Sequence, residues 1–415
     1  MNETPEVPAL TVATEGFSTS KELLDFLDPE IPLLFQRQGR GIVSQGVALE
    51  ATFRGESRFS EASAWWQSLR DSAQITNPIG RPGTGLVGFS QFPFSPESAH
   101  PGRVIIPRLV IGRDDAGWWL TRVGSQSDSP LEREHTSSDS TSAVLWESEP
   151  LSEEQFEEAV ARIITDMSAP PLHKVVLARR LVGHAKSSLS LDHALTTLGS
   201  AYPDTHLFAV GGFIGASPET LASVRENTLS LRVLAGSSAR GTDPDSDHRQ
   251  AAGLATSAKD LDEHEYAVSN VIDSLSRAGI AAIASDAPRA IKLPNLWHLA
   301  TDIRADFPEG TCVLDLVGAL HPTAAVAGTP TNAALSVIAT YEPFDRGYFA
   351  GPIGWLDGEG NGEFAIALRC AELSDDRLTV TAHAGAGVVK DSDPRAELLE
   401  TELKFRPIVE AFRSI

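Results

Sequence analysis

The sequence of 415 residues has only two cysteines and no long apolar run. No stretch reaches the roughly 18 apolar residues that a membrane-spanning helix needs. Cys312 and Cys370 lie far apart without metal-ligand spacing, so we expect two buried thiols in a reducing compartment and no disulfide. Residues 1–16 have no basic segment leading into an apolar one, so we expect no secretory signal. The sequence therefore predicts a soluble, cytoplasmic protein that does not bind membranes.

Positive charge is also scarce. Lysine and arginine total 34 against 56 aspartates and glutamates, and the formal net charge is −22. Such a field repels a polyanion over the whole surface, which excludes an extended nucleic-acid interface. A small anionic substrate can still bind where arginine, lysine, backbone N–H groups or a divalent cation are gathered locally.

The amino-terminal part has the pattern of a sheet. Strand-like runs separated by Gly, Pro and Ser cover residues 31–36, 46–53, 85–92 and 103–112. We expect a mostly β region over residues 1–122 with few helices, and a polar, flexible loop over 123–143. With the catalytic region expected over 150–415, the chain is predicted to form one large domain.

Strands and helices alternate after residue 150. Ser152 and Gln155 form a capping box in front of a helix with apolar residues at helical spacing. Short apolar runs then predict strands, and longer amphipathic segments predict helices, one of which begins near Ala258. The order of the elements predicts an α+β layered sandwich and not a doubly wound parallel sheet.

Polar groups interrupt these elements at a few points. Lys174 begins the apolar run 174–178; alone it is an ordinary strand-end lysine, but in a closed site its amine can serve as a general base. Glu219 follows Pro218 where we expect a strand to end and a short helix to begin. It is either a first-turn glutamate favoured by the helix dipole or a carboxyl kept protonated to act as an acid.

Two glycine-rich turns and one arginine could hold an anion. The turn Gly236–Gly241 (GSSARG) follows the strand-like run 229–234, and Gly385 and Gly387 end another strand. Glycines at such positions either only connect elements or let backbone N–H groups approach a carboxylate. Arg369 is expected inside an apolar strand, where it either bonds a buried carboxylate of the protein or binds an anion.

Several carboxylates are predicted to lie on helices. Glu263 occurs in a stretch so acidic that a solvated face is the simplest interpretation. Glu397 and Glu400 share one side of the last helix with Lys404 one turn further on, which by itself is an ordinary surface arrangement. If two helices present carboxylates to one point, they create an oxygen-rich site for Mg²⁺.

Taken in order, these motifs resemble the chorismate-utilising enzymes, and in detail the isochorismate synthases. The resemblance covers residues 150–415 and rests on the segments HKVVLAR, GASPE, LAGSSARG, SAKDLDEHE, LPNLWHLAT, LRC, AHAGAG and AELLETELK. It implies a single α+β domain in which two α/β subdomains surround a β-sandwich with a central cleft. The implied reaction is the Mg²⁺-dependent, reversible conversion of chorismate to isochorismate.

The resemblance also implies a role for each motif residue. Lys174 corresponds to the general base that activates water for attack at C2, and Glu219 to the acid that protonates the leaving C4 hydroxyl. The remaining positions hold the metal or the substrate: Glu263 and Glu400 as metal ligands with Glu397 nearby, Gly236 and Ser237 at the ring carboxylate, Arg369, Gly387 and Lys404 at the enolpyruvyl carboxylate, and His298 and Phe349 along the ring.

Other members of the family fit less well. Aminodeoxychorismate synthases commonly have a lysine where this chain has Ala235, and anthranilate synthases usually have glutamine at position 174 and a glutaminase partner. Salicylate synthases share the lysine and are the main alternative, but the segments 296–301 and 342–355, with Ser237, resemble the isochorismate synthases. A non-catalytic homologue is disfavoured because Lys174 and Glu219 are present. We expect no glutaminase subunit and a monomer, acting in menaquinone or siderophore biosynthesis.

Overall fold

The structure is a computed structural model that describes residues 7–124, 130–132, 143–167, 172–292, 296–308 and 310–413. Of Ser237, Lys259, Glu263 and Leu296 it describes the backbone alone. Most of the polar loop predicted over residues 123–143 therefore lies outside the described residues. None of the described helices has the length and apolar content required to cross a bilayer.

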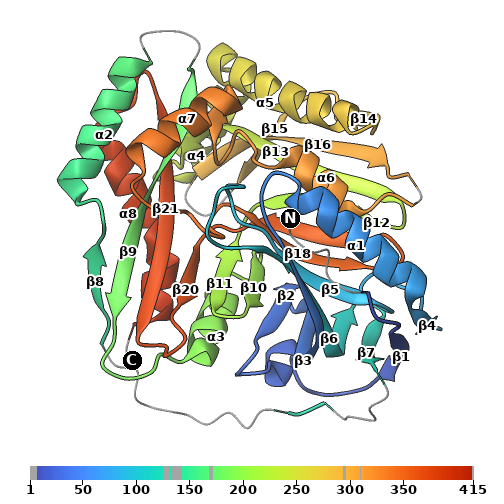
Figure 1. Ribbon diagram of the computed structural model, residues 1–415. Helices are drawn as coiled ribbons and strands as arrows, with labels where there is room; N and C mark the ends of the chain where they lie inside the picture. Colours follow the sequence, from blue (N-terminus) through green and yellow to red (C-terminus); the bar gives the residue numbers. More distant parts are fainter. Residues whose placement is uncertain are drawn as a thin grey trace.

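The chain contains helices and strands throughout (Figure 1). The helices are η1 (Leu23–Phe26), α1 (Arg58–Ser72), α2 (Glu153–Asp166), α3 (Leu191–Ala201), α4 (Pro244–Thr256), α5 (Ala258–Arg277), α6 (Val313–Leu320), α7 (Thr331–Tyr341) and α8 (Pro394–Ala411). The strands are β1 (Thr11–Phe17), β2 (Leu33–Arg37), β3 (Arg40–Phe53), β4 (Gln74–Thr76), β5 (Val87–Gln91), β6 (Gly102–Asp114), β7 (Gly117–Val123), β8 (Leu145–Ser148), β9 (Lys174–His184), β10 (His206–Val210), β11 (Phe213–Ser217), β12 (Thr220–Arg225), β13 (Thr228–Ala239), β14 (Ala282–Ala284), β15 (Arg289–Lys292), β16 (Leu296–Asp306), β17 (Gly328–Thr329), β18 (Pro352–Asp357), β19 (Gly362–Ile366), β20 (Cys370–Leu373) and β21 (Thr379–Val389).

The strands form two hydrogen-bonded series that share β3. The first series runs β1–β7–β6–β5–β18–β19–β12–β13–β16, with β3 also beside β6. The second runs β3–β2–β10–β11–β20–β21–β9. Apart from β1–β4 these pairings are antiparallel, which agrees with the mixed α+β class predicted from the sequence. Helices α2 and α8 lie beside the second series, and α4 and α5 beside the end of the first (Figure 1).

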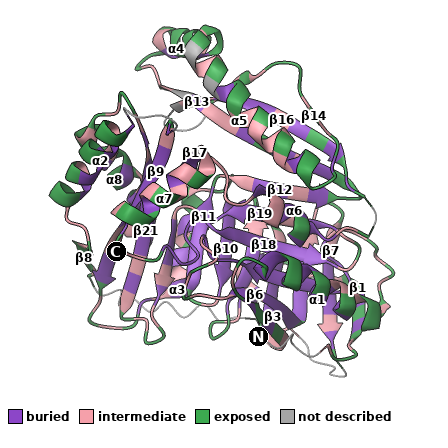
Figure 2. Cartoon of the chain, turned by 45° about the horizontal axis from the view of Figure 1, so that its top comes forward, coloured by how far each residue is buried: buried purple, intermediate pink, exposed green. Residues whose placement is uncertain are grey.

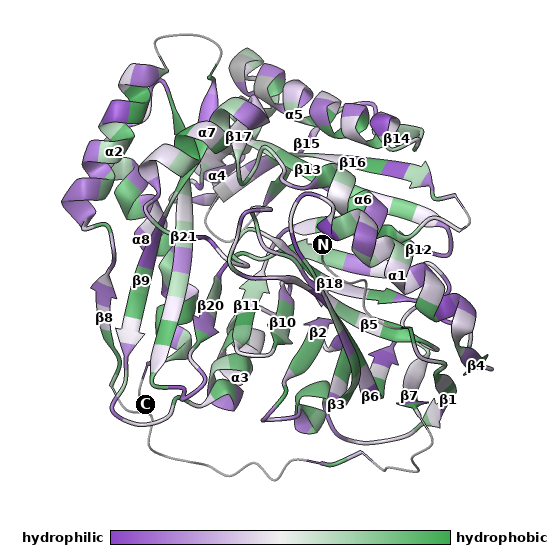
Figure 3. Ribbon diagram, viewed as in Figure 1, coloured by the Kyte–Doolittle hydropathy of each residue, from purple (hydrophilic) through white to green (hydrophobic). Residues whose placement is uncertain are grey.

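Local sequence explains where the helices begin and which side they bury. The capping box predicted at the start of α2 is present: the Ser152 hydroxyl accepts from the N–H of Gln155, and the Gln155 side chain bonds back to the N–H of Ser152. Phe156, Val160 and Ile163 are fully buried on one side of the helix. Figure 3 shows the same division of apolar and polar residues along α2 and α5.

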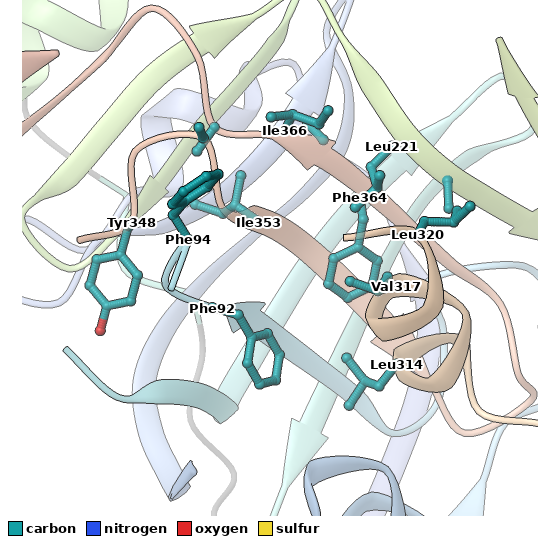
Figure 4. Close-up of a cluster of buried hydrophobic side chains, with 14 of the residues drawn as sticks. Phe92, Phe94, Leu221, Leu314, Val317, Leu320, Tyr348, Ile353, Phe364 and Ile366 are labelled. Carbon is teal, nitrogen blue, oxygen red and sulfur yellow. The ribbon is translucent and has the colours of Figure 1, made fainter. Parts of the chain in front are cut away.

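A large apolar core fills the space between the sheets and their helices, and Figure 2 shows that the central strands β10, β11 and β18 are buried along most of their length. Beneath α6, residues from distant segments meet, among them Phe92, Phe364 and Val317 (Figure 4). Gly318 lets α6 lie close to α1, because a Cβ there would lie 2.8 Å from Cβ of Phe59. Both cysteines are buried free thiols, as predicted.

Helix α1 lies within the amino-terminal region, for which few helices were expected, and buries Trp65 and Trp66. Two local predictions were wrong. Glu219 does not begin a helix, because it connects β11 directly to β12. Arg369 does not lie within a strand; the chain breaks between β19 and β20, and Arg369 has a positive φ of 49°. Both of the latter residues lie where the chain passes from one strand series to the other, and this position matters for the site.

Candidate active site

Two neighbouring connections carry the chain between the strand series. Glu219 lies in the connection from β11 to β12 and Arg369 in the connection from β19 to β20, while β11 pairs with β20 and β12 with β19. The connections are held together by backbone bonds, since the Ile366 N–H donates to the Glu219 carbonyl (3.0 Å) and the Ala216 N–H donates to the Arg369 carbonyl (3.1 Å). The ladder therefore fixes the relative position of a carboxyl and a guanidinium that are 150 residues apart in sequence.

Glu219 is partly exposed but surrounded by protein and by cations. Burial raises the pKa of its carboxyl above the ordinary value, while the positive charges of Lys174, Arg369 and Lys404 act in the opposite direction. Desolvation is the larger effect, so the protonated form is favoured relative to a free glutamate. Lys174, Arg369 and Lys404 therefore lie close enough for their charges to act on Glu219.

Arg369 has no ion-pair partner among the described residues. Burial lowers the pKa of the guanidinium, and the negative charges of Glu219 and Glu400 oppose this shift. Of the two alternatives that the sequence left open, direct bonding to a buried carboxylate of the protein is not observed in the described part of the chain. The backbone of Arg369 adopts a sparsely populated conformation, and its N–H donors form no ion pair with a described carboxylate. Such an arginine is suited to binding an anion.

Lys174 is the first residue of β9 and pairs with Val389 of β21 and Thr329 of β17. Gly387 lies close to the end of its side chain. A Cβ added at Gly387 would stand 3.0 Å from Cε of Lys174 and 3.8 Å from Nζ. The absence of a side chain at Gly387 therefore makes room for the end of the Lys174 side chain.

The glycine-rich turn begins at a bulge in the pairing of β13 with β16. The register shifts between Ala235 and Ser237, and Gly236 has a positive φ of 74°, which glycine adopts without a steric penalty. The Gly236 carbonyl bonds Nδ1 of His298 at 3.2 Å. Burial lowers the pKa of His298, and its nearest charges include Lys174 and Lys404. The bulge thus brings the turn and His298 to the same cluster of charges.

The last helix contributes a cation and two carboxylates. Lys404 Nζ donates to Glu400 Oε1 (2.5 Å) and to the Gly385 carbonyl (2.7 Å). Burial lowers the pKa of Lys404, and the neighbouring Glu400 opposes this shift. Burial raises the pKa of Glu397, and the charge of Glu400 adds to the increase. The predicted grouping on one side of α8 is therefore present.

The predicted roles of Glu263, Ser237 and Phe349 stay predictions. The side chains of Glu263 and Ser237 lie outside the described part of the structure, so their predicted roles are untested. Phe349 is 3 % exposed and stacks on His383 at a ring-centroid distance of 5.3 Å, so most of its surface packs against protein. Its place along the substrate ring stays a prediction.

Other residues hold the site in place and were not found from the sequence. His264 is buried beside Glu263 on α5, and its ring nitrogens bond the Ala235 carbonyl (3.0 Å) and Thr301 Oγ1 (2.7 Å). Asp247 of α4 accepts two bonds from Arg240 (2.6 and 2.7 Å) and one from Trp297 Nε1 (2.8 Å). The Arg240 side chain holds the pKa of Asp247 well below its usual range. These bonds anchor α4 and α5 to the glycine-rich turn. The bonds of His264 and Trp297 join residues 29 to 50 positions apart, which gave no signal in a single sequence.

Comparison with known proteins identifies the class. The model of the family described as "Chorismate binding enzyme" matches residues 32–413. This chain belongs to that family, which confirms the resemblance found in the sequence.

Among its relatives are the salicylate biosynthesis isochorismate synthase of Pseudomonas aeruginosa, 32% identical over 94% of this chain and 86% of that protein, and the isochorismate synthase DhbC of Bacillus subtilis, 35% identical over 68% of this chain and 74% of that protein. The solved structure of MenF, the menaquinone-specific isochorismate synthase from Escherichia coli, has a TM-score of 0.78 at 23% identity, covering 99% of this chain and 96% of that chain. The likeness to MenF supports the expected fold.

Proposed function

We propose that the protein is an isochorismate synthase, an isomerase that converts chorismate to isochorismate for menaquinone or siderophore biosynthesis. The observation that carries the proposal is Glu219, a carboxyl with a raised pKa placed among Lys174, Arg369 and Lys404. A dianionic ring that must lose a hydroxyl group requires an acid, here Glu219, together with anion-binding cations, here Arg369 and Lys404. The relatives' names agree with it.

Glu219 supplies the proton for the departing hydroxyl. Hydroxide is a poor leaving group, so cleavage of the C4–O bond requires protonation as the bond breaks. Because burial keeps the carboxyl of Glu219 protonated to a higher pH than a free glutamate, it can donate this proton and release water. The resulting carboxylate is then stabilised by the cations around it.

Lys174 accepts the proton of the entering water. As water adds at C2, the ring double bond shifts and the C4–O bond breaks, so the amine gains one proton and Glu219 loses one. The overall reaction exchanges one water for another and changes no oxidation state. Lys174 is held at the end of β9 beside Gly387, and a fixed base position is what this role requires.

Anion binding falls to Arg369, Lys404 and the glycine turns. Arg369 lacks a protein carboxylate partner in the described residues, and Gly236 presents its backbone at the bulge. These groups overcome the unfavourable field of a chain with a net charge of −22. His298 lies next to the same turn, where it can pack along the ring.

The carboxylates of α8 fit a Mg²⁺ site. Glu397 and Glu400 repel one another electrostatically, and such a pair is stabilised by a divalent cation. No group of three His, Cys, Asp or Glu side chains in the described residues is arranged to hold a metal, but Mg²⁺ commonly uses one or two carboxylates with water and substrate oxygens. Glu400 and Glu397, with Glu263 from α5, would hold it. Bound there, the ion would supply positive charge that fixes a substrate carboxylate.

Product analysis tests the proposal. Purified protein with chorismate and Mg²⁺ is expected to yield isochorismate, identified by chromatography. Lys174→Ala should abolish conversion while chorismate binding, measured by calorimetry, persists. If the variant kept near-normal turnover, Lys174 would not be the base.

The alternative function is salicylate synthesis, in which isochorismate loses pyruvate. The same incubation distinguishes the two, because salicylate as the main product at neutral pH would favour the alternative. Absence of any chorismate conversion by a folded, Mg²⁺-supplied protein would instead indicate a non-catalytic chorismate-binding homologue.

A further inference from the structure

A groove with polar and apolar walls lies outside the set of residues predicted for the active site. It has a volume of about 1050 Å³ and lies among the start of α1, the helices α5, α6 and α7, and the loop that contains Phe94. Figure 1 shows the three later helices on one side of the molecule. None of the residues predicted for catalysis, metal or substrate binding lines this groove.

A buried cation without a carboxylate partner lines the groove. Arg58 is 4 % exposed, its Nε has no hydrogen-bond partner, and within the described chain no carboxylate forms an ion pair with it. Within the described residues its side chain donates one hydrogen bond, from Nη1 to the Gly55 carbonyl at 3.2 Å, and its guanidinium lies 4.6 Å from the centre of the Phe59 ring. Leaving a buried guanidinium unpaired is costly, so an anion is expected to complete it.

Two further features of the groove favour an anion. Thr323 also lines it, and its buried Oγ1 has no partner. Arg58 is the first residue of α1, whose N-cap residue Ser57 makes no side-chain cap, and the amino end of a helix attracts negative charge. Burial lowers the pKa of Arg58, and the charge of the exposed Glu56 opposes this shift without forming an ion pair.

The negative groups of the groove are already hydrogen-bonded or are exposed to solvent. Glu342 bonds Arg346 and the Ala178 N–H, and Asp345 accepts from Ser98 and two backbone N–H groups. Glu56 and Glu97 are exposed. Arg58 is therefore the buried charge that an added ligand can neutralise.

We propose that this groove is a binding site for an aromatic carboxylate, separate from the active site. The carboxylate bonds Arg58 and the Thr323 hydroxyl, and the flat apolar body packs against the more exposed apolar lining of α7, which includes Leu335 and Ala339. The aromatic body distinguishes this ligand from a small inorganic anion, which would leave the apolar walls in contact with water. The proposal does not depend on the reaction assigned above.

Calorimetric titration of the full chain with benzoate and with benzamide, its uncharged counterpart, tests the assignment. Benzoate is expected to bind at least about tenfold more tightly than benzamide, because a charge-assisted bond to a buried arginine is lost with the carboxylate. Arg58→Gln should weaken benzoate by at least about tenfold. Arg70→Gln, at the exposed end of the same helix, and Arg369→Gln, in the active site, should leave benzoate binding unchanged.

Thr323→Val provides a second variant if Arg58→Gln does not fold, and it should weaken benzoate severalfold. Four results would overturn the proposal: no binding of benzoate at about 10 mM, equal binding of benzoate and benzamide, loss of binding in Arg369→Gln with retention in Arg58→Gln, or displacement of benzoate by an equal concentration of inorganic phosphate. The third result would locate benzoate in the active site, and the fourth would define a site for small anions in general.

Discussion

Gly387→Ala changes the position of the proposed base without removing it. The added Cβ would lie 3.0 Å from Cε of Lys174, whereas ordinary van der Waals contact begins near 3.4 Å, so the end of the lysine must move by about 0.4 Å. A displacement of about 1 Å at a reacting group can cost about a hundredfold in rate, so we expect kcat to fall by roughly tenfold.

The same substitution should not destabilise the fold. Gly387 does not have a positive φ, and replacing glycine by alanine at a compatible position stabilises by about 0.4–1 kcal/mol through the unfolded chain. Activity and stability are therefore expected to change in opposite directions, measured by the rate of isochorismate formation and by urea unfolding.

Gly385→Ala is the matched control. It lies two residues earlier on β21, and its Cβ would contact the Leu177 carbonyl and Val176 Cγ1, both at 3.2 Å, without touching Lys174. We expect a smaller loss of kcat than for Gly387→Ala. If Gly387→Ala kept kcat within twofold of the wild type, or if both variants lost activity equally, the space beside Lys174 would not control the base.

Three further predictions concern charge. Glu400→Gln should raise the Mg²⁺ concentration needed for half-maximal activity by at least about tenfold, whereas Glu410→Gln, which breaks an exposed ion pair on the same helix, should not; equal titrations would remove Glu400 from the metal site. The folded state favours the protonated form of Glu219, because its pKa is raised on folding. The contribution of Glu219 to the free energy of unfolding is therefore fully present below the unfolded pKa and is lost as pH rises through the folded pKa. Thermal unfolding should therefore show Glu219→Gln gaining stability relative to the wild type as pH rises above the ordinary pKa of glutamate, and a difference that stays constant with pH would contradict the assignment. Arg346→Met leaves a buried glutamate unpaired and should reduce the free energy of unfolding by about 3–5 kcal/mol in urea titrations; a loss below 1 kcal/mol would show that the pair is dispensable.

The sequence predicted those features that depend on neighbouring residues. The capping box of Ser152 and Gln155 and the apolar spacing behind it defined α2, and Lys174 begins a strand as expected. Helix α1 was missed although it carries two buried tryptophans, because the surrounding strand pattern dominated that region. Local rules therefore succeed where one segment decides its own structure.

Features that depend on distant segments could not be predicted in this way. Proline before Glu219 is compatible with a helix start, and only the pairing of β12 with β19 requires the chain to continue as a strand. The break at Arg369 has the same origin, since the chain changes strand series there. The family resemblance supplied the candidate site residues, but not the bonds of His264 and Asp247 that anchor α5 and α4.

The electrostatics of the site lead to a final prediction about when Glu219 is protonated. In the free protein the charges of Lys174, Arg369 and Lys404 oppose the effect of burial on its pKa. A bound substrate with two carboxylates neutralises part of this positive charge, so the pKa of Glu219 should be higher in the complex than in the free protein.

The acid is therefore held more firmly protonated when substrate is present. Because activity is lost as Glu219 ionises, the alkaline limb of kcat should lie at higher pH than that of kcat/KM, which reports the free protein. Arg369→Gln removes one of the opposing cations and should move the limb of kcat/KM toward higher pH. Measured profiles with coincident limbs, or a limb unmoved by that variant, would mean that another group controls the alkaline loss and that substrate charge does not reach the acid.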